Sequence, residues 1–193
     1  MIPVGQRVQE AIDHLDQGRF ALAVTPACLA LDVTSQRFYD AGPSGPTLTR
    51  RFVQEHLWLI AFMGFPELAS TALRIPFTHP EARPDAAGTV GLDDVICHVI
   101  RCSLLRIDDK SARITWTHAR PLCLDPSEHL ILNPSLIWAL IGAVIFSPVN
   151  RHEVIPDNYW LNIADFKMFI SELWGRIDLA KRVVTFYTGA SIP

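Results

Sequence analysis

The chain has 193 residues, of which 49% are apolar and 19% are charged, and its formal net charge is −3. This composition excludes an intrinsically disordered chain, which is poor in apolar residues. Four cysteines are too few for a disulfide scaffold. The 17 basic and 20 acidic residues are spread evenly, so the sequence contains no basic domain or tail. The length favours one domain, residues 1–193.

The sequence predicts neither a signal peptide nor a membrane span. Its first residues lack the basic start and apolar stretch of a signal peptide. The longest apolar run, 136–146, is shorter than the roughly 20 residues that a spanning helix needs. We therefore expect a cytoplasmic protein whose reduced cysteines act as small apolar side chains. These are Cys28, Cys97, Cys102 and Cys123.

The first 63 residues predict three helices. Val4, Val8 and Leu15 fall on one face of an amphipathic helix at 4–17. A second helix at 19–39 follows after a short gap, which indicates an antiparallel pair. Pro26 lies inside it, so we expect a kink or a fresh start near residues 23–25. A glycine- and proline-rich loop at 41–47 then precedes a third helix at 47–63.

The rest of the chain predicts short strands between further helices. The pattern favours strands at 71–77, 107–118 and 130–132, and a short strand at 159–163. Helices are predicted at 92–105, at 135–147 with a cap from Asn133-Pro-Ser135, and at 164–175 and 176–187. Residues 78–89 are predicted to form a loop. The fold class is therefore mainly α, with a small antiparallel β-hairpin or sheet insertion at 107–132 and a C-terminal extension at 151–193.

The segment 93–106 carries the residues with the clearest chemical potential. Its apolar residues face a core, so His98, Arg101 and Cys102 share another side of the predicted helix. Arg106 reaches that side only if the helix ends near Leu105. Two arginines and a histidine suit a phosphate ligand, because a guanidinium is a two-pronged donor and an imidazole moves protons near neutral pH.

The stretch Ile100-Arg-Cys-Ser-Leu-Leu-Arg-Ile107 resembles the signature of the HEPN superfamily (higher eukaryote and prokaryote nucleotide-binding domain). Members are four-helix bundles that often end a helix with Arg, four to six residues, then His. Active members are metal-independent ribonucleases in which Arg and His of two subunits face each other. Arg101 matches the arginine, but Arg106 stands where the histidine is expected, and arginine cannot act as a base. The resemblance thus implies a homodimeric, catalytically degenerate binding or regulatory module.

The expected ligand of this module is RNA or another nucleotide phosphate, bound by Arg101, Arg106, His98 and Arg113. The local excess of basic residues at 101–120, beside Trp116, agrees with such a surface but also fits an ordinary hairpin surface. No cofactor is expected. His98 and Cys102 have a spacing that can hold zinc, but no convincing second pair follows, so no metal is expected.

Alternatives remain open at this stage. One is an active metal-independent endoribonuclease of toxin or phage-defence type, with Arg101 and His98, or Arg51 and His56, as catalytic residues. Arg51 and His56 also fit a solvated helix face near Glu55. Another is an adaptor whose hairpin at 107–132 docks a protein partner. Four tryptophans fall in or beside apolar stretches and are expected to pack in the core or a dimer interface. These are Trp58, Trp138, Trp160 and Trp174.

Overall fold

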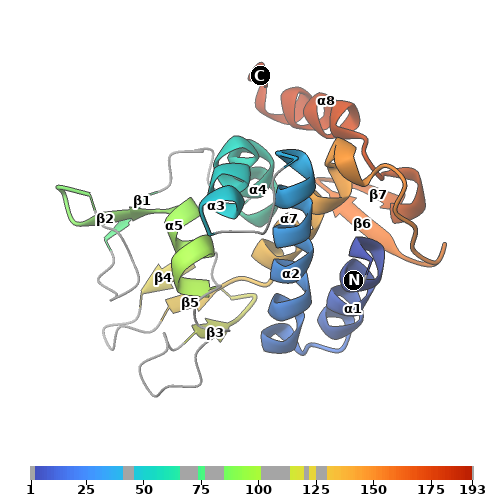
Figure 1. Cartoon of the computed structure of the whole chain (residues 1–193). Coiled ribbons are helices and arrows are strands. Elements are labelled where there is room, and N and C mark those ends of the chain that lie inside the picture. The colour runs from blue at the N-terminus through green and yellow to red at the C-terminus, as the bar shows by residue number, and fades with distance from the viewer. Residues whose placement is uncertain are drawn as a thin grey trace.

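The first two helices pack as an antiparallel pair in a computed structural model of the chain (Figure 1). The structure describes residues 3–40, 46–65, 74–76, 85–100, 114–119, 122–124 and 130–192. Helix α1 (Val4–Asp16) buries the predicted face, and α2 (Phe20–Phe38) runs through Pro26 as one element. A fresh start near Pro26 is therefore wrong. Packing of α2 on α1 and on the core holds the helix together where the proline removes one backbone donor.

The predicted third helix is divided in two at His56. Helix α3 (Pro46–Glu55) ends there, and α4 (Leu57–Gly64) begins at the next residue. The backbone N–H and the ring Nδ1 of His56 both lie within hydrogen-bond distance of the Phe52 carbonyl oxygen, at 3.1 and 2.9 Å. The backbone of His56 has a φ of −105° and a ψ of 12°, outside the regular α-helical values, so the prediction of one continuous helix at 47–63 is wrong.

A small antiparallel ribbon and a π-helix follow. Strand β1 (Arg74–Pro76) pairs with β2 (Thr89–Gly91), which leads into α5 (Leu92–Asp94) and the π-helix η1 (Val95–Ile100). The predicted helix at 92–105 is confirmed for its described part, 92–100, although i→i+5 hydrogen bonds replace the α pattern from Val95 onward. Of the predicted loop at 78–89, only residues 85–89 are described. Its last residue, Thr89, begins β2.

Three short strands form a second sheet in the order β3-β5-β4. They are β3 (Ile114–Trp116), β4 (Leu122–Leu124) and β5 (Leu130–Leu132). A small sheet was predicted within 107–132 and is confirmed for its described strands, but it is not wholly antiparallel, because β3 runs parallel to β5 and β4 runs antiparallel to it. The chain forms β4 before it returns to β5, so no tight hairpin connects the two parallel strands.

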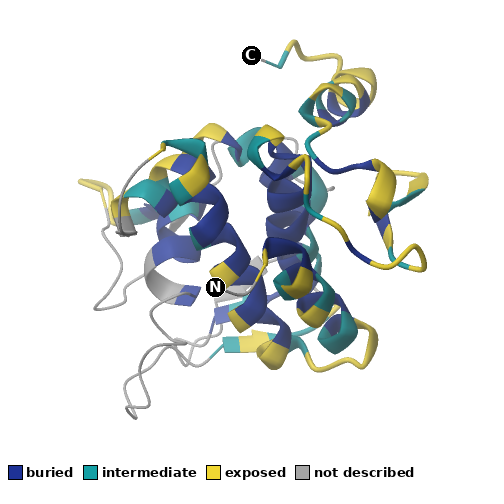
Figure 2. Cartoon of the chain, turned by 45° about the vertical axis from the view of Figure 1, so that its right-hand side comes forward, coloured by how far each residue is buried: buried dark blue, intermediate teal, exposed yellow. Residues whose placement is uncertain are grey.

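Helix α7 (Ser135–Phe146) lies at the centre of the molecule and is buried almost throughout (Figure 2). The Asn133 Oδ1 accepts the Ser135 N–H at 2.9 Å, which confirms the predicted cap. The Ser135 hydroxyl donates to the Gly64 carbonyl at 2.7 Å and so ties the start of α7 to the end of α4. The short 3-10 helix η2 (Pro148–Asn150) then ends the apolar run.

The C-terminal segment adds a hairpin and a last helix. Strand β6 (Trp160–Ile163) pairs antiparallel with β7 (Phe166–Phe169), and η3 (Ile170–Glu172) leads to α8 (Ile177–Thr188). The predicted helix at 164–175 is wrong, because strand pairing with 160–163 overrides the weak local pattern. The fold class, mainly helical with small sheets, is confirmed. Among the described helices, none has the length and apolar character to cross a membrane.

Candidate functional site

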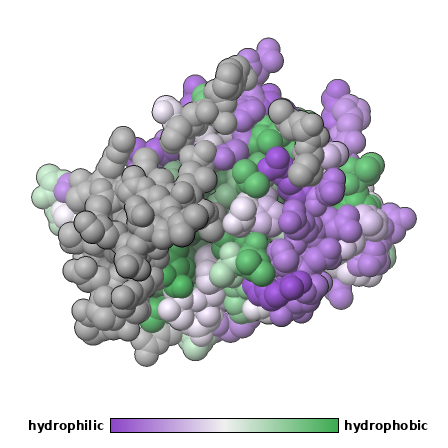
Figure 3. All heavy atoms as spheres, turned by 60° about the horizontal axis from the view of Figure 1, so that its bottom comes forward, coloured by the Kyte–Doolittle hydropathy of each residue, from purple (hydrophilic) through white to green (hydrophobic). Residues whose placement is uncertain are grey.

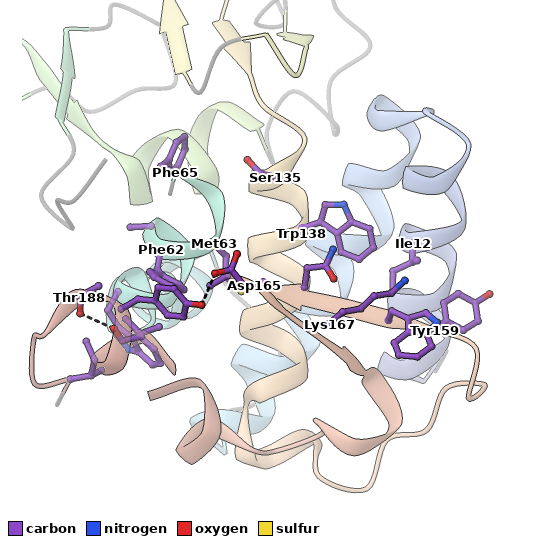
Figure 4. A pocket seen from close by; sticks show the side chains of 18 of the residues that line it. Ile12, Phe62, Met63, Phe65, Ser135, Trp138, Tyr159, Asp165, Lys167 and Thr188 are labelled. Atoms are coloured by element: carbon purple, nitrogen blue, oxygen red, sulfur yellow. Dashed lines mark hydrogen bonds between the residues drawn. The ribbon is translucent and has the colours of Figure 1, made fainter. Parts of the chain in front are cut away.

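A cavity of about 1270 Å³ lies between α1, α4, α7, the β6–β7 hairpin and α8 (Figure 4). It therefore combines segments from both ends of the chain. Its lining is mixed, with seven aromatic side chains beside three carboxylates, two asparagines and one lysine. The aromatic members are Trp58, Phe62, Phe65, Trp138, Tyr159, Trp160 and Tyr187. Large apolar cavities with a few polar groups are the usual form of small-molecule sites.

The last turn of α1 contributes two carboxylates, Asp13 and Asp16. They lie on the same side as the lining residue Ile12, which is part of the buried face of this helix. The Tyr159 hydroxyl donates to Asp13 Oδ1 at 2.6 Å, and this hydrogen bond is the main cause of the raised pKa of Tyr159. The tyrosine therefore stays a donor and fixes the orientation of the Asp13 carboxylate.

The hairpin forms one wall of the cavity because its side chains alternate. In β6, Leu161 and Ile163 are buried against the core, whereas Trp160 and Asn162 face the other side and line the cavity. Lys167 of β7 is the direct partner of Asn162, so it lies on the same face. The Lys167 Nζ lies 4.8 Å from the centre of the Trp160 ring, within cation–π distance.

The turn of this hairpin carries both backbone strain and a charge. Ala164 has a φ of 50°, in the left-handed region that non-glycine residues rarely adopt. Asp165 follows it and accepts the Tyr187 hydroxyl at 2.8 Å, and this hydrogen bond is the main cause of the raised pKa of Tyr187. The hydrogen bond joins the hairpin turn to α8 and holds a second carboxylate site at this end of the cavity.

Helices α4 and α7 supply the apolar wall. Trp58, Phe62 and Trp138 are half-buried and pack against the core from the cavity side. Gly142 of α7 permits a close approach of Met63, because an added Cβ would lie 2.6 Å from the Met63 Sδ. Core packing was predicted for the tryptophans and is confirmed for Trp174, which is 7% exposed. Trp58, Trp138 and Trp160 also line the wall of the cavity, a location that the sequence did not predict.

The site predicted from the sequence falls largely on residues outside the described ranges. Arg101, Arg106, Arg113 and Cys102 lie outside them, and His98 belongs to η1 although its side chain is not described.

The two acids that precede η1 are held by α3. Arg50 reaches Asp93 Oδ2 at 3.1 Å and Asp94 Oδ1 at 3.0 Å, and Gln54 donates to Asp93 at 2.8 Å. These contacts anchor α5 and the start of η1 to α3.

The second predicted pair, Arg51 and His56, does not share a site. Arg51 is exposed, pairs with Glu55 at 2.9 Å and lies over the Tyr39 ring at 4.6 Å. His56 is 5% exposed and stacks on Phe52, with ring centres 4.0 Å apart. Burial is the main cause of the lowered pKa of His56. The expected solvated face is thus confirmed for Arg51 and wrong for His56, whose flat ring packs in the core.

Among the described residues, no cluster of His, Cys, Asp or Glu has the arrangement to hold a metal ion. Exposed apolar side chains elsewhere include Leu22 and Leu29 on α2. The face that includes the turn between α1 and α2 is drawn in Figure 3, where hydrophobic side chains lie in separate areas between hydrophilic ones. Scattered apolar residues of this kind are normal for a protein surface. The cavity is therefore the strongest candidate site in the described part of the chain.

The sequence held one signal for this cavity, in residues 159–167. Trp160 and Asn162 alternate with two aliphatic residues, which is typical of a strand with one buried face. The exposed positions of such a strand carry an aromatic ring and an amide, and a lysine follows on the next strand. The remaining lining residues come from separate parts of the chain, and their meeting could not be read from local spacing.

Comparison with known proteins places relatives in mycobacteria. The model of the Rv1289 family matches residues 3–192. "Uncharacterized protein Rv1289" of Mycobacterium tuberculosis and "Uncharacterized protein Mb1320" of Mycobacterium bovis are each 27% identical to this chain over 192 residues. The alignments cover 95% of this chain and 88% of each relative. No solved structure matches the chain.

Proposed function

The chain belongs to the Rv1289 family, and we propose that it is a binding module whose cavity takes an extended organic ligand. The observation that carries this proposal is the cavity of about 1270 Å³ with its aromatic walls and fixed carboxylates. Sites for drug-sized molecules have volumes of about 300–1,000 Å³. A ligand longer than a single ring system, or one with two separate polar ends, suits this larger volume.

The preorganised polar groups support a binding role. Tyr159 and Tyr187 each hold one carboxylate in place before any ligand arrives. Fixed groups of this kind lower the entropy that a site loses when it binds its ligand. The strained Ala164 next to Asp165 supports the same role, since strained backbone occurs preferentially at functional sites.

A neutral aromatic probe tests this proposal without assuming the charge of the ligand. We expect 2-naphthol to bind the wild-type chain saturably, measured by the anisotropy of its fluorescence. Asn162→Trp would fill part of the cavity, and Trp138→Leu would remove part of its aromatic wall. Each change should weaken binding about tenfold, which corresponds to roughly 1.4 kcal/mol.

The matched control is Phe186→Ala on α8. Phe186 is 78% exposed and adjacent to Tyr187, but it is not part of the cavity lining. Its variant should bind 2-naphthol as the wild type does. Far-UV circular dichroism checks that all three variants are folded. Equal binding by wild type and both cavity variants, or weakening by Phe186→Ala alone, would contradict the proposed site.

A second candidate function rests on the HEPN resemblance. It is a module that contacts RNA or a nucleotide phosphate through Arg101, Arg106, His98 and Arg113, with a homodimer as its expected state. The π-helix Val95–Ile100 favours it, because π-helical turns are frequent at functional sites and this one leads directly to Arg101.

Incubation with single-stranded and structured RNA, without metal, tests this second function. RNA binding lost on Arg101→Ala would support the module, and cleavage lost on the same change would support the ribonuclease alternative. If the chain neither binds nor cleaves either RNA, the RNA-binding module and the ribonuclease alternative are both contradicted.

A further inference from the structure

The cavity carries carboxylates at two separate ends. Asp13 and Asp16 lie at the α1 end beside Tyr159, and Asp165 lies at the hairpin turn beside Tyr187. Figure 4 shows Tyr159 and Asp165 on opposite sides of the cavity, with Trp138 and Lys167 between them. Tyr159 precedes β6 and Asp165 follows it. A strand of four residues spans roughly 13 Å, so the two acidic ends are separated by about the length of this strand.

The charge of the lining is not balanced. Its described members include three carboxylates and one ammonium group, that of Lys167, and therefore carry a net charge of −2. None of the described residues forms an ion pair with Asp13 or Asp165, which accept hydrogen bonds from neutral tyrosines instead. The negative charge thus remains available to a ligand, and it opposes the entry of a phosphate or another anion.

The end of α1 adds to this negative potential. Asp13 and Asp16 lie in the last turn of a helix of 13 residues. The C-terminal end of a helix carries a partial negative charge, which favours a cation nearby. The α1 end of the cavity therefore combines two carboxylates with a helix terminus of the same sign.

The aromatic wall between the two ends already accommodates one ammonium group. The Lys167 Nζ lies over the Trp160 ring, as a cation–π contact requires. Trp138 and Phe62 offer further apolar surface along the same cavity. The methylene groups of an aliphatic ligand would pack on these surfaces, and ammonium groups at its two ends would each lie near a carboxylate.

We propose that the ligand of this cavity is a linear aliphatic polyamine, with one terminal ammonium group at Asp13 and Asp16 and the other at Asp165. This inference rests on the proposed binding function and specifies its ligand class. Tyr159 and Tyr187 orient the two carboxylate ends, and the tryptophans contact the methylene chain.

Isothermal titration calorimetry of the full chain tests the proposal at about 50 mM salt, where screening is moderate. The probes are spermidine, 1,8-diaminooctane, 1,3-diaminopropane and the monoamine octylamine. We expect spermidine and 1,8-diaminooctane to bind at least tenfold more tightly than the short diamine and the monoamine, because only they reach both ends.

Charge-neutral variants identify the two ends. Asp13→Asn and Asp165→Asn keep an oxygen that can accept the tyrosine hydroxyl but lose the charge. Each should weaken spermidine binding about fivefold. Lys167→Met should strengthen it about twofold. Glu172→Gln is the matched control, because Glu172 is exposed and lies outside the cavity lining, and its variant should bind spermidine as the wild type does.

Two results would overturn the polyamine assignment. Octylamine could bind as tightly as 1,8-diaminooctane, or both aspartate variants could bind spermidine as well as the wild type. If 2-naphthol still binds in either case, the cavity remains a ligand site and only the ligand class is wrong. If the wild-type chain binds neither the polyamines nor 2-naphthol, the proposed function itself is contradicted.

Discussion

Two acidic regions of the molecule use their carboxylates in opposite ways. Asp93 and Asp94 are bound by Arg50 and Gln54, so their charge is compensated within the chain. Asp13 and Asp165 accept hydrogen bonds from tyrosine hydroxyls and form no ion pair with any of the described residues. The first arrangement holds α5 against α3. The second leaves a net negative charge that a cationic ligand can balance, and this difference distinguishes a structural cluster from a candidate binding site.

The largest expected effect is on the compensated cluster. Arg50→Leu leaves the partly buried Asp93 and Asp94 without their cation, so we expect the free energy of unfolding to fall by about 3 kcal/mol. The adjacent Arg51→Leu is the matched control. Its side chain is 64% exposed, and its loss should cost about 1 kcal/mol or less. Urea denaturation measures both changes, and equal losses would remove the distinction between a structural and an exposed pair.

The buried His56 should make the free energy of unfolding depend on pH. Its pKa is lowered by burial, so above about pH 6.5 the ring is neutral in both folded and unfolded chains. Below that pH the unfolded chain binds a proton that the folded chain does not. Stability should therefore fall as the pH drops, by up to about 1.4 kcal/mol per pH unit from this group.

Denaturation at about pH 7.5 and about pH 5.5 measures this slope. His56→Gln should reduce the slope, although the variant is less stable overall. His152→Gln, at an exposed position, should leave the slope as in the wild type. A wild-type slope retained by His56→Gln would show that another group causes the pH dependence.

The strained turn beside the cavity predicts a smaller effect of opposite sign. Ala164 has a φ of 50°, a conformation that glycine adopts without steric cost. We expect Ala164→Gly to raise the free energy of unfolding by about 1 kcal/mol. Thermal denaturation measures the change. A loss of stability would show that the turn is not strained at this residue.

The smallest expected effect on stability concerns Asp165, a carboxylate of the cavity. Asp165→Asn should change the free energy of unfolding by less than about 0.5 kcal/mol, because this carboxylate is exposed and its loss of charge leaves no cation unpaired. Urea denaturation of Asp165→Asn and Arg50→Leu under the same conditions compares their losses of unfolding free energy directly. A loss comparable to that of Arg50→Leu would mean that Asp165 is structural and not reserved for a ligand.

Much of the helical framework could be predicted from the sequence, because its signals are local. The face of α1 and the uniformly apolar α7 follow from spacing and composition alone. The misses have non-local causes. The break at His56 is a departure of one residue from helical backbone angles, and β7 exists because it pairs with β6 across a turn that lacks glycine.

The cavity was harder to predict than the fold. Asp13, Trp138 and Tyr187 are far apart in the sequence, and only the packing of α1, α7 and α8 brings them to one cavity. The prediction of a site in the arginine-rich segment at 101–113 rests on residue types, and this segment lies outside the described residues. Residue type alone also does not reveal which carboxylates are compensated by a neighbour.

The most direct measurement of the central claim uses the five tryptophans as internal probes. Trp58, Trp138 and Trp160 line the cavity, whereas Trp116 and Trp174 do not belong to its lining. Titration of the ¹⁵N-labelled chain with 2-naphthol, followed through the indole N–H signals, should shift the first three and leave the other two in place. Uniform shifts of all five, or shifts confined to Trp116 and Trp174, would contradict a ligand site in this cavity.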